Sequence, residues 1–357
     1  MSTAPAAPAP ASEPGTETEA GGVVAAAASG GSLKGTLILA GARLLGWLPE
    51  APLVAAAESI GELWYRAQPA RAAQARRNLR RVCEGLAAQG RGTPRARRAA
   101  TDPDALERMV RACFRHAVRY YLEVARAGAY TLEGAIASIE VETPAEVNEA
   151  LRSGRPIVLL GMHYGAIELP IVYVSDLVGH AVTAPMELVS DPGLRRWFVE
   201  SRSRVGVGIV PLKDARRALL AALRRGESVG MVNDRDITGT GIPTSFFGHD
   251  APISPGPALL AVEAGVPVYV GSCRRIGTGR YIGRLIEVPV PAQGSRRERM
   301  VALTNGIARA FEDLLADGPE QWWGAFHPIW PDLAGDACEA SGKDARATGT
   351  GPGAPAA

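Results

Sequence analysis

The chain has 357 residues, of which 46% are hydrophobic, and its 39 basic and 37 acidic side chains leave a formal net charge of +2. This length supports a substantial core in one large domain or two modest ones. No uninterrupted apolar run reaches the roughly 18 residues of a spanning helix, so we predict none, and we expect no nucleic-acid partner.

Four cysteines are scattered without the spacing of a metal site or a redox motif: Cys83, Cys113, Cys273 and Cys338. They are predicted to be reduced thiols in a cytosolic compartment, and no metal is expected. The N-terminus also lacks the basic start and apolar block of a secretory signal.

The two ends of the chain differ in composition from its middle. Residues 1–32 are rich in Ala, Pro, Gly and Glu, and residues 334–357 form a Gly/Ala/Pro tail. Such segments bury too little apolar surface to fold. We therefore predict two disordered tails around a single domain at 33–333.

The domain is predicted to open with a layer of helices. Residues 33–65 are apolar at helical spacing and are interrupted by two prolines, which predicts two helices joined there. The first places Lys34 and Arg43 near Trp47, a combination that suits a helix lying in the membrane interface. Packing of this helix on the protein's own core is the alternative.

Two further helices, at 71–90 and 103–130, complete this N-terminal layer, which spans 33–130. The stretch 71–98 holds nine arginines and Glu84 as its single acid: Arg71, Arg76, Arg77, Arg80, Arg81, Arg91, Arg95, Arg97 and Arg98. Such a pattern fits either solvated helix faces or an anionic partner, for which phospholipid headgroups are the leading candidate.

After residue 130, short runs rich in Val and Ile alternate with helical segments. The runs are PIVLLG (156–161), HAVTAP (180–185), GIVPL (208–212), SVGMVND (228–234) and VPVYVGSCRR (266–275). This alternation predicts an α/β fold with a mainly parallel central sheet flanked by helices. RYIGRLIEVPV (280–290) adds an antiparallel strand near an edge, and 297–323 reads as a long closing helix.

A histidine and a glutamate follow the first of these strands. His163 lies just past the strand's C-terminal end, where open α/β sheets gather their ligands. Glu168 comes five residues later, or roughly 140° around a helix, so the two converge only if His163 lies in a turn and Glu168 reaches back. A carboxylate in that position would orient the imidazole as a general base on a hydroxyl. A structural histidine at a helix start is the alternative.

A second polar block follows another predicted strand. Within residues 230–265, Asp234, Arg235 and Asp236 precede a Gly-rich turn and an aromatic pair at 246–247 that is expected to be exposed. Charged residues at a strand's end, followed by a loop of this length, indicate a function rather than packing alone.

Together, HYGAIE and NDRDITGTGIPTSFFG with the following SPGPALLA resemble the lysophospholipid acyltransferase superfamily. The nearest branch is that of the lipid A lauroyl/myristoyl acyltransferases and the phosphatidylinositol mannoside acyltransferases. The resemblance extends over about residues 75–330 and implies a glycerol-3-phosphate acyltransferase-like fold. It also implies transfer of a fatty acyl group from an acyl-CoA or acyl carrier protein thioester to a lipid hydroxyl, with no further cofactor.

By this resemblance, His163 would take the proton from the acceptor hydroxyl and Glu168 would hold and polarise His163. The oxyanion and any phosphate of the substrates call for cations, and acids would pair with these cations, contact the acceptor sugar or, for Glu187, assist His163. The substrate-binding candidates are Arg202, Arg204, Arg235, Asp234, Asp236 and Glu187.

The resemblance places the enzyme on the phospholipid surface at the cytoplasmic face of the cell membrane, as a peripheral or monotopic protein with a lipid-linked acceptor. Ala/Arg/Gly-rich usage is typical of high-GC bacteria and favours a phosphatidylinositol mannoside-like acceptor. The alternatives are a lipid A-type lauroyl/myristoyl acyltransferase, a thioesterase-like hydrolase and a catalytically inactive membrane-binding relative. The aromatic residues at 322–330 would form an interfacial belt or pack on the N-terminal helices.

Overall fold

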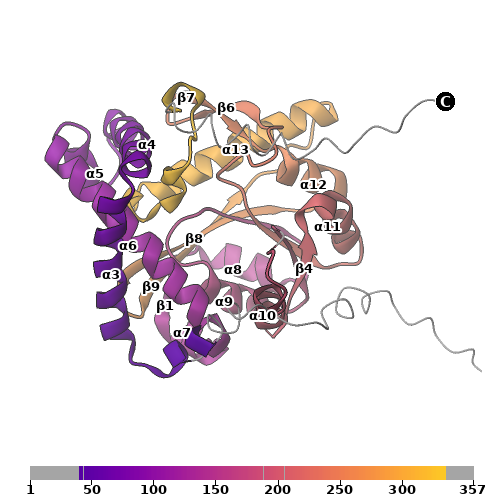
Figure 1. Cartoon of the computed structure of the whole chain (residues 1–357). Coiled ribbons are helices and arrows are strands. Elements are labelled where there is room, and N and C mark those ends of the chain that lie inside the picture. The colour runs from indigo at the N-terminus through magenta and orange to yellow at the C-terminus, as the bar shows by residue number, and fades with distance from the viewer. Residues whose placement is uncertain (1–39, 43, 188, 205, 335–357) are drawn as a thin grey trace, which may run out of the picture.

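The computed structural model describes residues 40–42, 44–187, 189–204 and 206–334 (Figure 1). The predicted tails lie outside these residues, except for Ala334, as does the start of the first predicted helix. In the described part of the chain, no helix is both long enough and apolar enough to cross a membrane.

A mainly parallel sheet of seven strands forms the centre of the molecule, in the order β1-β9-β8-β2-β5-β3-β4. The predicted α/β class is therefore confirmed. The strands are β1 (Ile139–Val141), β2 (Val158–Gly161), β3 (Val182–Met186), β4 (Val207–Pro211), β5 (Ser228–Val232), β8 (Val268–Gly277) and β9 (Arg280–Val288). β9 pairs antiparallel with β8 and lies one strand from the edge, as predicted.

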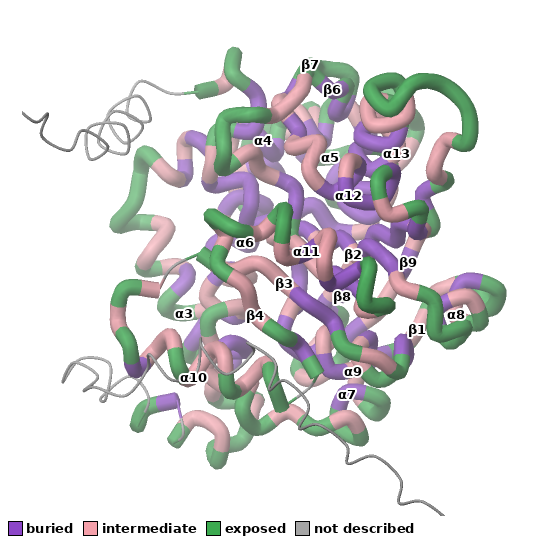
Figure 2. The backbone as a smooth tube through the Cα atoms, turned by 90° about the vertical axis from the view of Figure 1, so that its right-hand side faces the viewer, coloured by how far each residue is buried: buried purple, intermediate pink, exposed green. Residues whose placement is uncertain are grey.

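Helices cover both faces of this sheet (Figure 1). They are α7 (Leu132–Ser138), α8 (Ala145–Arg152), α9 (Glu168–Val178), α10 (Pro192–Ser203), α11 (Ala215–Arg224), α12 (Gly256–Ala264) and α13 (Arg296–Leu315). Because strand side chains alternate, Val158 and Leu160 of β2 join the core beneath α11, α12 and α13. Ile157 and Leu159 join the core beneath α8 and α9. Because both faces of these strands are covered, their sequences are continuous apolar runs. Buried backbone fills the centre of the molecule in Figure 2.

The N-terminal layer contains α3 (Glu50–Ala67), α4 (Pro69–Ala88), α5 (Pro94–Ala99) and α6 (Pro103–Arg126), close to the predicted helices. α3 begins directly after Pro49, which confirms the predicted break at that proline, whereas Pro52 lies in the first turn of α3 and does not break it. α3 and α6 pack so closely at Gly61 that a Cβ there would lie 2.6 Å from the Cα of Arg115. On the preceding helical segment Trp47 is 91% exposed; its placement in a membrane interface stays a prediction.

The aromatic residues of the second polar block are not exposed, and the prediction on that point was wrong. Phe246 and Phe247 are 1% and 3% exposed. A two-stranded hairpin, β6 (Ile242–Phe246) and β7 (His249–Ile253), turns them inward, and Phe246 stacks on Trp330 with ring centroids 5.4 Å apart. Sequence spacing did not reveal this hairpin, whose partner aromatic lies more than eighty residues away.

The aromatic residues near the C-terminus are also buried: Trp322, Trp323, Phe326 and Trp330. Phe326 contacts Trp64 of α3 and Phe114 of α6, so packing on the N-terminal helices is confirmed and the interfacial belt is not found.

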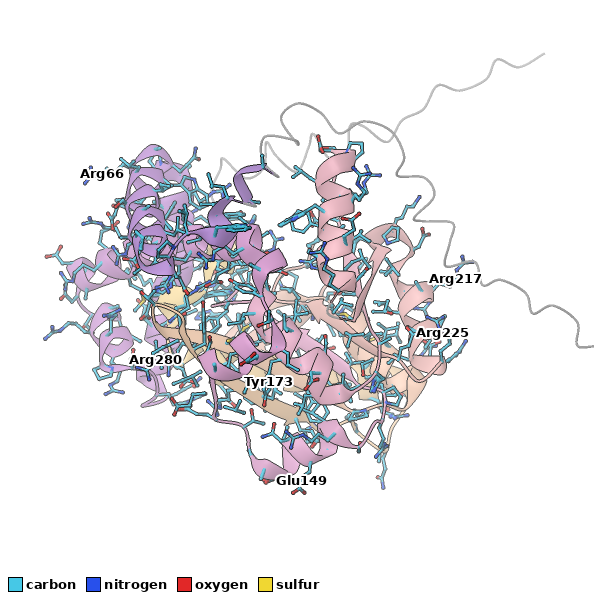
Figure 3. The ribbon with its side chains drawn as sticks, turned by 90° about the horizontal axis from the view of Figure 1, so that it is seen from below. Arg66, Glu149, Tyr173, Arg217, Arg225 and Arg280 are labelled. Atoms are coloured by element: carbon cyan, nitrogen blue, oxygen red, sulfur yellow. The ribbon has the colours of Figure 1, made fainter. Side chains whose placement is uncertain are left out.

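Seen from below, Tyr173 of α9 lies against the sheet while Arg217 of α11 projects from the surface (Figure 3).

Candidate active site

Strand register places His163 beside Asp234. β2 and β5 are parallel neighbours in which Val158 pairs with Val229 and Gly161 pairs with Val232. His163 and Asp234 each follow two residues after the last of these pairs, so they leave the same sheet edge at the same level. This is the edge at which α/β sheets bind ligands.

The carboxylate of Asp234 is the hydrogen-bonding centre of the site. Oδ1 lies 2.6 Å from Nδ1 of His163, and Oδ2 accepts from the His163 backbone N–H at 3.1 Å and from Nε1–H of Trp322 at 2.8 Å. Burial raises the pKa of Asp234, but the His163 ring and these hydrogen bonds together lower it by more. The pKa of Asp234 therefore lies below its ordinary value. The carboxylate is therefore ionised at neutral pH and can only accept.

This geometry determines the state of the imidazole. Because the Asp234 carboxylate has no proton to give, Nδ1 of His163 carries the hydrogen and donates it. In the neutral ring, Nε2 then has a free lone pair. The His163 side chain is 17% exposed, so an incoming substrate can reach it.

The segment after α13 closes over the turn that carries His163. Gly165 N–H donates to the Gln321 carbonyl at 3.1 Å, and Gly324 N–H donates to the His163 carbonyl at 3.1 Å. A Cβ at Gly324 would overlap the Asp234 carboxylate. Gly165 has φ 56°, and a Cβ there would overlap the carbonyl of Cys273. Glycine is thus required at both positions, because neither position has room for a Cβ atom.

A buried ion pair holds this turn from behind. Arg275 of β8 binds Glu123 of α6 through two hydrogen bonds of 2.7 Å and donates at 2.8 Å to the Gly165 carbonyl. The Gln321 side chain bonds to both the backbone N–H and the carbonyl of Arg275, at 2.9 and 2.8 Å. α6, β8 and the segment after α13 therefore meet at the turn.

The structure differs from expectation in the partner of Glu168. This glutamate is the first residue of α9 and is 5% exposed, and its Oε1 accepts from Nη2 of Arg202 at 2.9 Å. The ring of His163 bonds to Asp234 instead. Because His163 is drawn towards β5, the expected Glu168–His163 hydrogen bond is replaced by two separate pairs.

The other predicted site residues divide between the loop and the surface. Asp236 organises its own loop by accepting from the backbone N–H groups of Thr238, Gly239 and Gly241, rather than pairing with an arginine. Glu187 and Arg204 are exposed, and in the described residues neither side chain has a hydrogen bond or ion pair.

Two tryptophans that the sequence reading did not assign to the site contribute to it. Trp322 bonds Asp234, and Trp323 lies edge-on to the His163 ring with centroids 4.6 Å apart while stacking on Tyr120. Within the part of the chain that the structure describes, Nε1–H of Trp323 and Nε–H of Arg235 are buried without an acceptor. The Trp-Trp doublet was the available signal, but nothing local in the sequence links it to His163.

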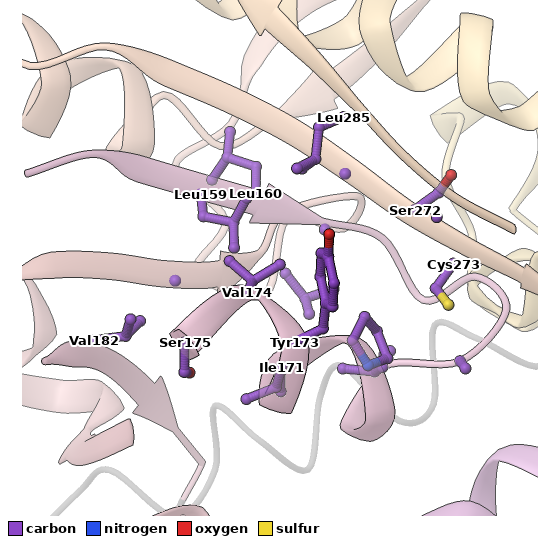
Figure 4. A pocket seen from close by; sticks show the side chains of 18 of the residues that line it. Leu159, Leu160, Ile171, Tyr173, Val174, Ser175, Val182, Ser272, Cys273 and Leu285 are labelled. Carbon is purple, nitrogen blue, oxygen red and sulfur yellow. The ribbon is translucent and has the colours of Figure 1, made fainter. Parts of the chain in front are cut away.

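An apolar cavity of about 210 Å³ lies between α9 and the sheet, beside the His163 turn (Figure 4). Leu159 and Leu160 of β2, Ile171, Tyr173 and Val174 of α9, and Leu285 of β9 line it. Arg202, the partner of Glu168, and Arg284 of β9 are its charged lining residues, and Tyr164 also borders it. An apolar pocket beside a basic imidazole suits a long hydrocarbon substrate.

Comparison with known proteins identifies the family of the chain. The chain matches the model of the bacterial lipid A biosynthesis acyltransferases over residues 33–331. It belongs to this family. The protein is therefore an acyltransferase, with an acyl donor and a lipid-linked acceptor as its substrates.

Two sets of relatives indicate the branch of the family. A phosphatidylinositol mannoside acyltransferase of Mycolicibacterium smegmatis is 27% identical over 311 residues, which cover 86% of this chain and 93% of that protein. Proteins of the same name from two strains of Mycobacterium tuberculosis are each 27% identical over 197 residues, or 54% of this chain and 59% of theirs. The predicted branch of the superfamily is thereby confirmed.

We predict that His327, beside the site, makes this acyltransferase lose stability in mild acid. Burial, with Arg235, His163 and Arg71 nearby, lowers the pKa of His327 to about 4. Unfolded histidine binds its proton near pH 6.5, so this stability is present above about pH 6.5 and is lost as pH falls towards 4. The loss is roughly 2 kcal/mol, and urea unfolding over this pH range measures it.

His327→Gln removes this proton uptake and should flatten the pH profile between those limits. His116, whose pKa burial also lowers, titrates in both proteins, so the difference between them isolates His327. The exposed His249→Gln serves as control and should follow the wild-type profile. Parallel profiles for wild type and His327→Gln would contradict the assignment.

Proposed function

We propose that this acyltransferase moves a fatty acyl group from an acyl-CoA or acyl carrier protein thioester to a hydroxyl of a phosphatidylinositol mannoside-like glycolipid, with His163 as general base and no further cofactor. The observation that supports it is the hydrogen bond from Nδ1 of His163 to Asp234, which leaves Nε2 free. A base must present a lone pair to the hydroxyl that it deprotonates.

The reaction then follows from the state of this ring. Nε2 of His163 takes the proton of the acceptor hydroxyl as its oxygen attacks the thioester carbonyl. The C–S bond breaks, the imidazolium returns the proton to the leaving sulfur, and the products are an ester and a free thiol. Asp234 stabilises the imidazolium between these steps. Cys273 beside the cavity is an unsuitable nucleophile because burial raises the pKa of its thiol.

We assign the apolar cavity to the acyl chain. Its position beside Tyr164 would bring the thioester carbonyl near His163 while the hydrocarbon tail lies under α9. Arg202, held by Glu168 at 2.9 Å, borders the cavity and is available to bind the polar head of the donor. Glu168 would thus act by positioning Arg202.

The oxyanion of the tetrahedral intermediate needs donors, which Trp323 and Arg235 can supply. Trp323 contacts the His163 ring, and its Nε1–H and the Nε–H of Arg235 are buried without a partner in the described residues. An unpaired buried donor costs roughly 1–3 kcal/mol, which a bound anion would offset. We therefore assign Arg235, with Trp323, to binding of the developing negative charge.

The acceptor and the location rest on similarity and on exposed side chains. The M. smegmatis relative named for phosphatidylinositol mannoside covers most of both chains and supports that acceptor class. Leu44 and Trp47 in the N-terminal layer, and Ile60 and Leu63 on α3, are more than half exposed, as is typical of an interfacial surface. We place the protein peripherally on the cytoplasmic membrane face.

We predict that His163→Ala lowers acyl transfer by at least roughly 10²-fold, because a positioned general base supplies that much. Asp234→Asn should lower kcat to a similar extent with little change in KM, because it removes the acceptor that sets the tautomer. Glu168→Gln should cost less in kcat. Transfer of labelled palmitoyl, from both thioester donors, to phosphatidylinositol mannoside and to a lipid A precursor measures these effects.

The exposed His249→Ala is the matched control and should retain wild-type transfer. A severe loss in Glu168→Gln with a mild loss in Asp234→Asn would instead make Glu168 the orienting carboxylate. Acylation of the lipid A precursor alone would contradict the proposed acceptor.

We predict that Ala184→Phe, which fills part of the cavity from β3, shifts the enzyme towards shorter acyl chains. Lost space for a few methylenes should lower kcat/KM for palmitoyl relative to octanoyl by roughly tenfold or more. Ala145→Phe, at an exposed position on α8, is the control. An unchanged palmitoyl to octanoyl ratio would mean that the chain lies elsewhere.

We predict that Arg235→Gln lowers kcat/KM by roughly 10²-fold through loss of an oxyanion donor. The urea midpoint should not fall, because Arg235 makes no hydrogen bond or ion pair to other described residues. Arg235→Lys keeps the charge but not the planar fork, and should recover part of the rate. Full activity in Arg235→Gln would exclude this role, and Arg217→Gln on α11 controls for loss of a surface charge.

A further inference from the structure

Arginines gather around a second, open cavity in the N-terminal layer. It has a volume of about 680 Å³ and lies between α5 and α6. Eight residues line it, of which five are arginines: Pro94, Arg95, Arg98, Ala105, Arg108, Arg111, Ala112 and Arg115. None of them belongs to the proposed catalytic site, and we call this cavity the arginine cleft.

Helical spacing brings these five side chains together. Arg108, Arg111 and Arg115 are three and four residues apart on α6, so they share one face of that helix. Arg95 and Arg98 are three residues apart on α5, which packs against the same part of α6. Five like charges therefore border one concave surface, where a low-dielectric wall concentrates their field.

Nearby carboxylates neutralise only part of this charge. Glu62 of α3 serves both Arg111 and Arg115. Glu320 lies 3.1 Å from Arg95, and Asp102 lies 3.7 Å from Arg108. All three acids come from outside the residues that line the cleft.

Arg98 makes no ion pair or side-chain hydrogen bond with any residue that the structure describes, and its side chain is exposed. Three carboxylates thus pair with four of the five guanidinium groups. Glu107 also acts on Arg111, but it is paired with Arg76 at 2.6 Å, so an excess of two positive charges remains at the cleft. An unneutralised cluster of this kind is stabilised by a bound anion.

We propose that the arginine cleft binds the phosphates of anionic phospholipid headgroups and so seats the protein on its membrane. Guanidinium groups match phosphate oxygens with paired hydrogen bonds. The site goes beyond the proposed acyl transfer, since its ligand is a lipid that is held and not consumed.

The surroundings of the cleft favour a lipid surface over a soluble anion. Glu62, which binds two cleft arginines, belongs to α3, and that helix also carries Ile60 and Leu63, which are 54% and 62% exposed. A helix with exposed apolar side chains next to a basic cleft suits the boundary between acyl chains and headgroups. A soluble phosphate compound or an acidic protein would make no use of the apolar neighbours.

The test is co-sedimentation of the full chain with vesicles of phosphatidylcholine alone and with vesicles that also contain phosphatidylglycerol. Wild type should prefer the anionic vesicles. The double variant Arg98→Gln/Arg108→Gln should bind them roughly tenfold more weakly, given the contribution of each basic residue at an anionic surface. Arg217→Gln/Arg224→Gln removes the same charge from exposed positions on α11 and should bind as wild type does.

Each other outcome would overturn the proposal. Equal binding by wild type and the cleft variant, or an equal loss in the α11 variant, would leave the cleft without a specific role. If anionic vesicles are not preferred but pyrophosphate or acyl carrier protein binds wild type and not the cleft variant, the ligand is a soluble anion. His163→Ala should sediment like wild type, so failure of the catalytic proposal and failure of this one are distinguishable.

Discussion

The buried charge of Asp234 is the constraint on which the site depends. A carboxylate that is 1% exposed keeps its charge only because three donors compensate for its lost hydration. Those donors come from the turn after β2 and from Trp322 beyond α13, whereas Asp234 follows β5. One ion therefore binds three distant segments together, and the same ion fixes the tautomer of His163. Folding and chemistry share this requirement, which explains why Trp322 is fully buried at the centre of a polar site.

The buried Arg275–Glu123 ion pair fixes the geometry of the turn that carries His163. Burying Arg275 and Glu123 costs desolvation that their attraction does not reliably repay, so stability alone does not account for the pair. Its function follows from what else Arg275 binds: the Gly165 carbonyl and, through its backbone, Gln321. These contacts hold the left-handed turn at Gly165 against the segment that carries Trp322 and Trp323. The N-terminal layer, through Glu123, thereby supports a site to which it gives no acid or base.

Local sequence patterns predicted the helices and strands well. A strand buried on both faces and a capped helix each depend on residues that are neighbours in the sequence. His163 could be placed at a strand end for the same reason. The partner of His163 could not, since Asp234 becomes its neighbour only when β5 inserts beside β2, an adjacency that the order of elements along the chain does not reveal. Glu168, five residues after His163, was expected to reach back to it from the start of the next helix. Phe246 and Phe247 were misjudged similarly, because Trp330, on which Phe246 packs, follows much later in the chain.

The separation of the two carboxylates has a chemical consequence. If Glu168 and Asp234 both bound His163, two negative charges would compete for one imidazole, and like charges held close cannot both remain ionised at low cost. Instead Glu168, in the first turn of α9 where a negative charge is favoured, binds Arg202 at the border of the apolar cavity. The five-residue spacing from His163 to Glu168 therefore connects the His163–Asp234 pair on one side of the turn with a cationic group on the other. An acyl donor would meet both groups within one short segment of chain. That proximity would account for the spacing even though His163 and Glu168 make no hydrogen bond with each other.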